Sequence, residues 1–266
     1  MNSSASIPDE QRVVARFDHQ ARRYHGRYRD VSGSGHSFRI RERRLYELFD
    51  TPGGAVLDIG CGPGITVAHL VGRGCHVSGV DLSEEMIAEC RRAFGHLPAA
   101  TFSVGRIERL AFPDGAFDTV ICMGVVEYIA DDAAAVREMA RVVRPGGTVL
   151  ISLPNRWSPF RLWRRHVFRP ATDAVRTLLG RGPRQGLFHR EYHPPAYARL
   201  LAASGLEPVD AVYYNFKLMP SPFDEWCPGL TVWTSARLEW LARSPLRWLA
   251  TGLIVRAVKR PSPEAR

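Results

Sequence analysis

Residues 55–64 read Ala-Val-Leu-Asp-Ile-Gly-Cys-Gly-Pro-Gly, an apolar run that passes directly into a turn with glycine at every second position. The apolar run predicts a short buried strand. Gly60, Gly62 and Gly64 let the backbone approach a ligand closely and leave N–H groups exposed at the start of the next helix. A helix start of this kind binds a carboxylate or a phosphate. The turn therefore predicts a ligand site at the end of the first strand.

A carboxylate follows at the end of the next apolar run, CHVSGVD (75–81), where Asp81 stands 17 residues after Gly64. At that edge of a parallel sheet a carboxylate can accept hydrogen bonds from both hydroxyls of a ribose. The dinucleotide fingerprint G-x-G-x-x-G is absent, because Ile65 and Thr66 follow Gly64. The spacing favours a nucleoside ligand and leaves a nicotinamide oxidoreductase as a remote alternative.

Strands and helices alternate on both sides of this turn. Helices are expected up to about Val71, over 83–94 behind the Ser83 cap, and over 131–143 and 194–204. Apolar runs rich in β-branched residues predict strands at 55–60, 75–81, 100–104, 117–123, 148–153, 206–214 and 251–260. Near-continuous apolar strands separated by helices are typical of an α/β fold, with a parallel sheet covered on both faces.

Other segments interrupt or flank this alternation. Residues 1–50 are expected to form an N-terminal helical segment, with helices at 8–29 and about 37–50 and a flexible break at 32–35. The remaining divisions are a ligand-binding core at 51–153, a basic aromatic insertion at 154–190, the C-terminal half of the core at 191–260 with a second insertion at 215–250, and a tail at 261–266. We expect both insertions to form a substrate cap together with residues 1–50.

The composition is that of a globular protein with a sizeable core, since 45% of the 266 residues are apolar and 10% are aromatic. It excludes disorder for the bulk of the chain. No apolar stretch approaches the ~18–20 residues that a membrane span requires. The start, MNSSASIPDEQ, lacks the basic-then-apolar pattern of a signal peptide. Five cysteines without C-x-x-C spacing predict reduced thiols, a cytoplasmic location and no metal site.

The net charge of +9 is concentrated in one stretch. Residues 154–190 hold nine arginines against the single acidic residue Asp173, interleaved with aromatic side chains, and tryptophans and arginines alternate again over 235–250. Helices with aromatics on one side and arginines on the other lie at membrane interfaces. The pattern predicts peripheral association with the inner, anionic face of a membrane. A solvated cap face, an acidic carrier protein and a phosphorylated substrate stay open as alternatives; nucleic acid is disfavoured, because no RNA-binding module accompanies the charge.

The run VLDIGCGPG…GVDLSEEMI…LAFPDGAFDTVICMGVVEYI…VVRPGGTVLISLPN resembles class I S-adenosylmethionine-dependent methyltransferases, and most closely their small-molecule branch, which is similar to ubiquinone and menaquinone methyltransferases. The resemblance covers about 55–155 tightly and the final strands loosely. It implies a Rossmann-like, doubly wound, seven-stranded sheet whose last strand is antiparallel, with helical cap insertions, and S-adenosylmethionine as the cofactor. The residues implied in cofactor binding are Asp58, Gly60, Cys61, Gly62, Gly64, Asp81, Leu82, Met86, Ile107 and Met123.

The same resemblance implies a role for most of these residues. Asp58 and the glycine turn would line the methionine end of the cofactor, and Asp81 would hold the ribose. Leu82 would flank the adenine, and Met123 would lie beneath the sulfonium. Cys61 and Cys122 beside this pocket are interpreted as small buried hydrophobic residues.

One position departs from the family pattern. The family usually places an acidic residue after the glycine that follows the third strand, where this chain has Arg106 after Gly105. An arginine side chain cannot accept a hydrogen bond from the adenine amino group. Backbone groups at Ile107, the carboxylate of Glu108, or a less specific adenine site are the alternatives.

Methyl transfer from a sulfonium is an in-line displacement that mainly requires positioning and exclusion of water. A base is needed only where a hydroxyl must lose its proton. The candidates are His189 and His193 in FHREYHPP, Glu127 and Tyr128 after the fourth strand, and His25 and His36 near the N-terminus. Tyr128 is interpreted as a pocket wall more readily than as a base.

The sequence also limits the acceptor. An N/D-P-P-Y/F turn, which is usual in enzymes that methylate nucleic-acid amino groups, is absent, because residues 123–128 read MGVVEY. The predicted function is methyl transfer to a hydroxyl of a small amphiphilic or lipid-like acceptor in a capped pocket. O- or N-methylation of a carrier-bound, phosphorylated or glycan-linked acceptor, and a non-catalytic cofactor-binding protein, are the alternatives.

Overall fold

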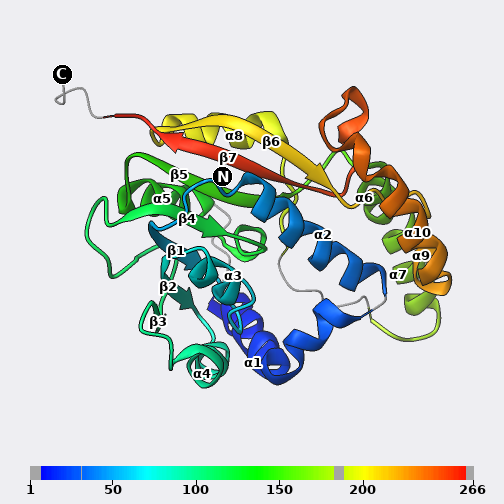
Figure 1. Ribbon diagram of the computed structural model, residues 1–266. Helices are drawn as coiled ribbons and strands as arrows, with labels where there is room; N and C mark the ends of the chain where they lie inside the picture. Colours follow the sequence, from blue (N-terminus) through cyan, green and yellow to red (C-terminus); the bar gives the residue numbers. More distant parts are fainter. Residues whose placement is uncertain (1–6, 31, 183–188, 262–266) are drawn as a thin grey trace.

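The computed structural model describes residues 7–30, 32–182 and 189–261. At its centre lies a seven-stranded sheet with the order β3-β2-β1-β4-β5-β7-β6 (Figure 1). The strands are β1 Ala55–Ile59, β2 His76–Asp81, β3 Ala100–Val104, β4 Phe117–Cys122, β5 Val143–Pro154, β6 Leu206–Tyr214 and β7 Gly252–Lys259. β7 is antiparallel to both of its neighbours, whereas the pairs from β3 to β5 are parallel. The predicted α/β sheet with an antiparallel last strand is confirmed.

Helices cover both faces of the sheet. In chain order the α-helices are α1 Ile7–Arg29, α2 Gly33–Leu48, α3 Val67–Gly72, α4 Glu84–Phe94, α5 Asp132–Val142, α6 Pro159–Trp163, α7 Arg169–Leu178, α8 Pro194–Ala203, α9 Phe223–Trp226 and α10 Pro228–Leu238. Shorter helical turns are η1 Val126–Tyr128, η2 Arg164–Phe168, η3 Glu239–Arg243 and η4 Pro245–Leu249.

The alternation of side chains along each strand explains why both faces are covered. Val56 packs into the apolar cluster that includes α2, α3 and α4, whereas its neighbour Leu57 packs into the cluster that includes α5 and α8. Both side chains are fully buried. Leu150 and Ile151 of β5 divide between the same two clusters. Strands that are apolar on both sides need a helical layer on each face.

The predicted flexible break at Ser32–Gly35 is wrong, because this segment begins α2. Ser32 caps the helix by accepting a hydrogen bond from the N–H of Gly35 at 3.3 Å, and its own hydroxyl donates to Asp30 at 2.7 Å. Gly33 and Gly35 are buried. A Cβ on Gly33 would lie 3.6 Å from Thr231 of α10, an ordinary van der Waals distance, so α2 begins packed against α10.

Strand β5 also begins earlier than expected, at Val143 instead of Thr148. Its pairing with β4 shifts register between Phe117 and Thr119. Residues 144–146 are thus an exposed irregularity within the strand, whereas Gly147 is buried.

The insertions lie at the end of the molecule toward which β6 points, beyond the carboxyl ends of the parallel strands (Figure 1). Asn215, directly after β6, anchors the second insertion to this end. Its side-chain amide donates to Thr251 at 2.7 Å and to Ser37 of α2 at 3.2 Å, and its backbone N–H donates to Glu239 at 2.8 Å. Glu239 in turn pairs with Arg44 of α2 at 3.2 Å. These contacts fix the second insertion against α2.

Candidate active site

The turn after β1 passes close to two neighbouring segments, so that only glycine fits. Gly60 and Gly64 have φ angles of 66° and 81°, which side-chain-bearing residues rarely adopt. A Cβ on Gly60 would lie 2.1 Å from the side chain of Val125, and one on Gly64 would lie 2.8 Å from the ring of Phe94. The N–H of Gly60 donates to the carbonyl of Val80 at 2.7 Å, which holds the turn against the end of β2.

Asp81 joins this turn to the start of α4. One carboxylate oxygen accepts from the N–H of Gly62 at 2.9 Å, and the other accepts from the N–H of Ser83 at 2.9 Å. Burial raises the pKa of Asp81, while these backbone hydrogen bonds oppose the rise. The hydroxyl of Ser83 caps α4 by accepting from the N–H of Met86 at 3.1 Å. Asp81 therefore connects the turn to α4 through hydrogen bonds and also presents its carboxylate at the wall of a cavity.

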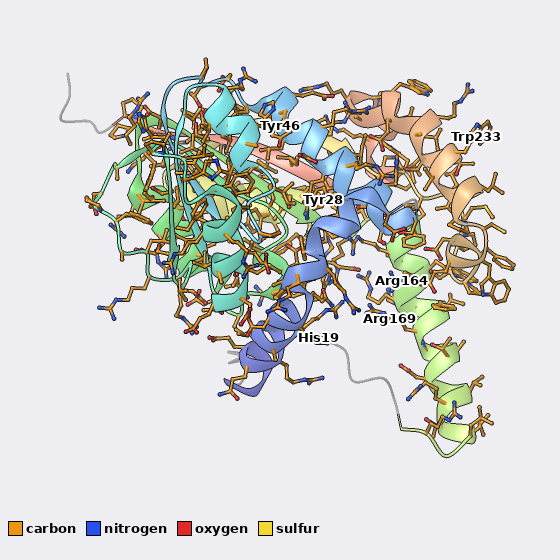
Figure 2. All side chains as sticks on the ribbon, turned by 60° about the horizontal axis from the view of Figure 1, so that its bottom comes forward. His19, Tyr28, Tyr46, Arg164, Arg169 and Trp233 are labelled. Atoms are coloured by element: carbon orange, nitrogen blue, oxygen red, sulfur yellow. The ribbon has the colours of Figure 1, made fainter. Side chains whose placement is uncertain are left out.

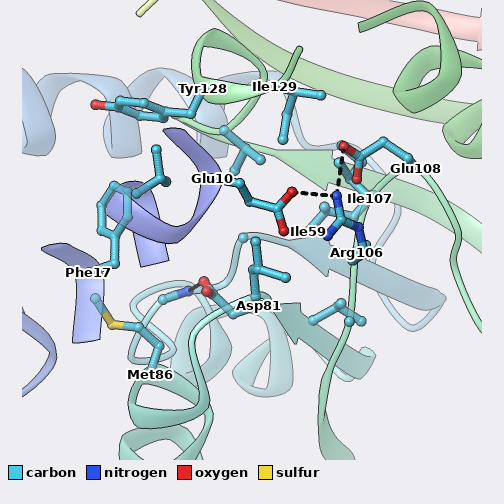
Figure 3. Close-up of a pocket in the computed structure, with 18 of the residues that line it drawn as sticks. Glu10, Phe17, Ile59, Asp81, Met86, Arg106, Ile107, Glu108, Tyr128 and Ile129 are labelled. Atoms are coloured by element: carbon cyan, nitrogen blue, oxygen red, sulfur yellow. Dashed lines mark hydrogen bonds and ion pairs between the residues drawn. The ribbon is translucent and has the colours of Figure 1, made fainter. Parts of the chain in front are cut away.

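This cavity has a volume of about 370 Å³ and runs along the carboxyl ends of β1, β2, β3 and β4 (Figure 3). It is within the size range of small-molecule sites. The residues predicted from sequence that line it are Gly60, Gly62, Asp81, Leu82, Met86, Ile107, Met123 and Tyr128. Gly64 does not line the cavity; it lies in the turn where the backbone passes close to Phe94 of α4.

Helix α1 forms the opposite wall of the cavity. Val13, Phe17 and Tyr24 line it from this helix, together with Glu10 (Figure 3). Val13, Phe17 and Tyr24 recur at helical spacing in the sequence, which indicates an apolar face of α1, and in the structure this face lines the cavity. No signal in the sequence indicates Glu10.

Arg106, the residue that departs from the family pattern, is paired with this helix. Its guanidinium donates two hydrogen bonds to the carboxylate of Glu10, one of them at 2.7 Å, and lies 3.7 Å from Glu108 (Figure 3). Among the residues predicted near the adenine, Ile107 and Glu108 also line the cavity.

A smaller cavity of about 50 Å³ adjoins the main one, with which it shares Tyr24, Gly60, Gly62 and Met123. Asp58, Cys61 and Arg41 are among its lining residues. Burial raises the pKa of Asp58 to about 7, and the nearby charge of Asp81 adds to the rise, while the hydroxyl of Thr66 opposes it by donating at 2.5 Å. The guanidinium of Arg41, a residue that sequence analysis missed, lies 5.1 Å from the ring centre of Phe38. A carboxylate and a guanidinium here can bind the ammonium and carboxylate of an amino acid.

Tyr128 and His189, two of the four predicted catalytic residues, contact each other, but of the four only Tyr128 lines the cavity. Tyr128 lines it, with its ring edge-on to Phe17 of α1 at 5.6 Å and to His189 at 5.4 Å. Burial raises the pKa of Tyr128 to about 12, which suits a wall and not a base. Desolvation of the imidazole ring and the positive charge of Arg161 lower the pKa of His189 to about 4. His189 keeps an exposed surface and is neutral at pH 7.

The other candidates lie elsewhere. Glu127 is buried, one of its carboxylate oxygens has no hydrogen-bond partner among the described residues, and burial raises its pKa. His193 precedes α8 and contacts Trp157, with 5.9 Å between the ring centres. His36 is buried at 3.2 Å from the hydroxyl of Ser235. The side chain of His25 falls outside the described part of the chain.

The two cysteines beside the site are buried thiols. Cys61 lies 3.9 Å from Cys90, sulfur to sulfur, and Cys90 donates to the carbonyl of Gly62 at 3.0 Å. Burial raises the pKa of Cys122 well above its usual range. Within the described residues no group of three or more His, Cys, Asp or Glu side chains is arranged to hold a metal ion.

Comparison with known proteins relates this geometry to a family. Residues 57–151 match a family described as a methyltransferase domain. A ubiquinone biosynthesis O-methyltransferase of Aromatoleum aromaticum is 34% identical over 166 residues, which cover 62% of this chain and 68% of the relative. A demethylmenaquinone methyltransferase of Beutenbergia cavernae is 36% identical over 155 residues, which cover 57% of this chain and 62% of the relative. The match thus spans about two thirds of the length of each relative.

Solved structures share the fold. A chain from the complex between the Haloferax volcanii Trm112 methyltransferase activator and a putative methyltransferase superposes with a TM-score of 0.65 at 19% identity, covering 92% of this chain and 97% of that chain. The sheet order, the glycine turn after β1 and the acidic end of β2 occur here together with the match to curated relatives. On these grounds the chain belongs to the class I S-adenosylmethionine-dependent methyltransferases.

Proposed function

We propose that this protein transfers a methyl group from S-adenosylmethionine to a hydroxyl of a small amphiphilic or lipid-like acceptor. The observation that carries the proposal is the cavity between the glycine turn and α1, one wall of which consists of Phe17 and Tyr128. Aromatic side chains suit a flat, apolar acceptor. The printed names of two curated relatives, which refer to ubiquinone and demethylmenaquinone, support an amphiphilic acceptor.

The residues at the cavity fit the cofactor. Gly62 has a φ of 54°, and a Cβ on it would have only Tyr24 within 4 Å, at 3.9 Å, so any side chain there would enter the cavity that both residues line. Asp81 would hold the ribose hydroxyls, since each carboxylate oxygen retains acceptor capacity after its backbone hydrogen bond. Asp58 and Arg41 would hold the ammonium and carboxylate of the methionine end. When bound, the cofactor supplies a methyl group that the sulfonium charge already activates.

The protein's part in the reaction is then positioning and proton transfer. Tyr128 and Phe17 would orient the acceptor and exclude water from its hydroxyl. His189, neutral at pH 7 and adjacent to Tyr128, would accept the hydroxyl proton as the new carbon–oxygen bond forms and the carbon–sulfur bond breaks. Glu127 and His193 have no comparable contact with the cavity.

The surface of the insertions supports peripheral association with a membrane. The 154–190 and 215–250 segments hold most of the exposed large apolar side chains, with Leu178, Trp226 and Trp240 exposed by 86%, 70% and 74%. Figure 2 shows α7 extending away from the body of the molecule, with Trp233 on α10 at the same end. Amphipathic helices with aromatic and basic side chains bind anionic lipid surfaces. No helix in the described part of the chain is long and apolar enough to span a bilayer.

Part of the basic charge is neutralised within the fold. Arg161 and Arg165 both pair with Glu191, at 3.3 and 2.7 Å, and Arg190 pairs with Asp132 at 2.5 Å. Arg169 and Arg176 on α7 make no ion pair with the described residues. The charge proposed to face anionic lipid is therefore that of α7, at the inner face of the membrane in a cytoplasmic protein.

The first prediction concerns the ribose. Asp81→Ala should weaken S-adenosylmethionine binding by about 1.5–3 kcal/mol, because charge-assisted hydrogen bonds are lost. Titration calorimetry measures the dissociation constant, and thermal unfolding verifies that the variant is folded. Asp114→Ala, at an aspartate whose side chain is 80% exposed, is the matched control and should bind as the parent does. Parental affinity in Asp81→Ala would mean that the sugar binds elsewhere.

The second prediction concerns pH. Asp58 has a pKa of about 7 without ligand, and a bound ammonium group favours its ionised form. Binding below pH 7 must therefore release a proton. The affinity for the cofactor should increase as the pH is raised toward 7, by up to about tenfold per pH unit, and should level off above pH 7. Calorimetry at several pH values, in buffers of different ionisation enthalpy, measures the release. Asp58→Asn should remove the proton release and the pH dependence of affinity that come from this carboxyl group. An unchanged pH dependence in the variant would contradict the role given to Asp58.

The third prediction concerns the acceptor and the base. With labelled S-adenosylmethionine, the protein should methylate a long-chain phenol in preference to a carrier-bound or phosphorylated acceptor. His189→Ala should lower kcat by about 10²-fold, the low end of the contribution of a general base, because its lowered pKa makes His189 a weak base. His96→Ala, at an exposed histidine that, unlike His189, makes no ring contact with Tyr128, should retain parental kcat. Cofactor binding without turnover on any acceptor would instead favour a non-catalytic protein.

The fourth prediction concerns the membrane. The protein should co-sediment with anionic vesicles at low salt, less at high salt, and little with neutral vesicles. Replacing Leu178 and Leu179 by Ser should reduce binding, because both side chains lie exposed at the end of α7. Val209→Ser, at an exposed apolar side chain on β6, is the control. Equal recovery in the supernatant under every condition would exclude this membrane surface.

A further inference from the structure

The end of the main cavity next to β3 has its own polar groups. Gly105, Arg106, Ile107 and Glu108 line it after β3, and Glu10 of α1 lies opposite. Because β3 is the outer neighbour of β2 in the sheet, a nucleoside whose sugar binds at Asp81 directs its base toward this end. Apolar side chains of Leu82 and Ile107 are available for the faces of the base.

The edge of an adenine base carries an exocyclic amino group, which donates hydrogen bonds, and a protein acceptor placed there distinguishes adenine from a base without this group. A guanidinium has only donors, so Arg106 cannot supply one. Arg106 instead donates to both carboxylate oxygens of Glu10, with 2.7 Å from Nη2 to Oε2. A carboxylate has about four lone-pair sites, so Glu10 retains acceptor capacity after this pairing.

We propose that Glu10 accepts the hydrogen bond from the adenine amino group and that Arg106 positions it. The proposal rests on the cofactor orientation given under the proposed function. Figure 3 shows the Glu10 side chain extending from α1 into the pocket, with Arg106 between it and Glu108. The pair is half-exposed, with 39% of the Glu10 and 48% of the Arg106 side chain accessible, so it stabilises the fold little by itself.

The location of Glu10 has a consequence for the cofactor. In this arrangement the specificity-determining carboxylate belongs to the helix that covers the cavity, and not to the sheet. Recognition of the base and closure of α1 are then one event, because the contact exists only when α1 lies across the site. Glu108, on the other side of Arg106 at 3.7 Å, is the competing acceptor and provides the matched control.

The test compares two ligands by titration calorimetry: S-adenosylhomocysteine, and S-inosylhomocysteine, in which a carbonyl oxygen replaces the amino group. The parent protein should prefer the adenosine ligand by about tenfold or more, the scale of one hydrogen bond to a charged group. Glu10→Ala should lose most of this preference, whereas Glu108→Ala should keep it. Full preference in Glu10→Ala, or its loss in Glu108→Ala, would overturn the proposal.

A second readout is amide hydrogen exchange in α1. The adenosine ligand should slow exchange in α1 of the parent protein and of Glu108→Ala, and should slow it less in Glu10→Ala. Equal protection in all three would contradict the coupling between base recognition and helix closure. If the parent protein binds neither ligand, the cofactor site itself is wrong, an outcome distinct from binding without discrimination.

Discussion

The carboxylate of Asp81 connects the three backbone segments on which the cavity depends. It accepts hydrogen bonds from Gly62 in the turn after β1 and from Ser83 at the start of α4, and it stands itself at the end of β2. Burying a carboxylate is costly unless hydrogen bonds compensate, so the turn and the helix start must keep this arrangement. These hydrogen bonds hold the glycine turn in place without a ligand, and preorganisation of this kind reduces the entropic cost of binding.

The sequence predicts this rigid part well because its signals are local. Apolar runs bounded by glycine and a Ser83 cap with acidic residues in the first turn depend on neighbouring residues alone. The start of α2 is mispredicted because Ser32–Gly35 is a break by local propensity, whereas in the folded protein Ser32 caps the helix and Gly33 and Gly35 are buried in it. Tertiary contacts override propensity at such positions.

The same reasoning explains the site residues that sequence reasoning missed. Glu10 and Arg41 belong to helices whose placement over the turn depends on the tertiary fold, and neither occurs in a motif. The net charge of residues 154–190 also overestimates the unpaired charge of this segment, because Arg161 and Arg165 pair with Glu191, which lies just outside it. Local composition overstates the free charge of a segment that folds back on an acidic neighbour.

Contacts of α1 with the core differ in kind from those within the sheet. Near its N-terminus the helix is held over the cavity by the Asp18–Ser83 hydrogen bond at 2.5 Å, the edge contact of Phe17 with Tyr128, and the half-exposed Glu10–Arg106 pair. Its C-terminal part packs through Tyr24 and Tyr28 against Phe38 of α2. The N-terminal part has few buried apolar contacts, and such segments open at a lower free energy than a core does. A site that must admit a cofactor and an acceptor needs such a wall, since the opposite wall is the buried edge of the sheet. In the proposed function, opening of α1 admits both ligands, and the aromatic side chains that meet on closure remove water from the reacting hydroxyl.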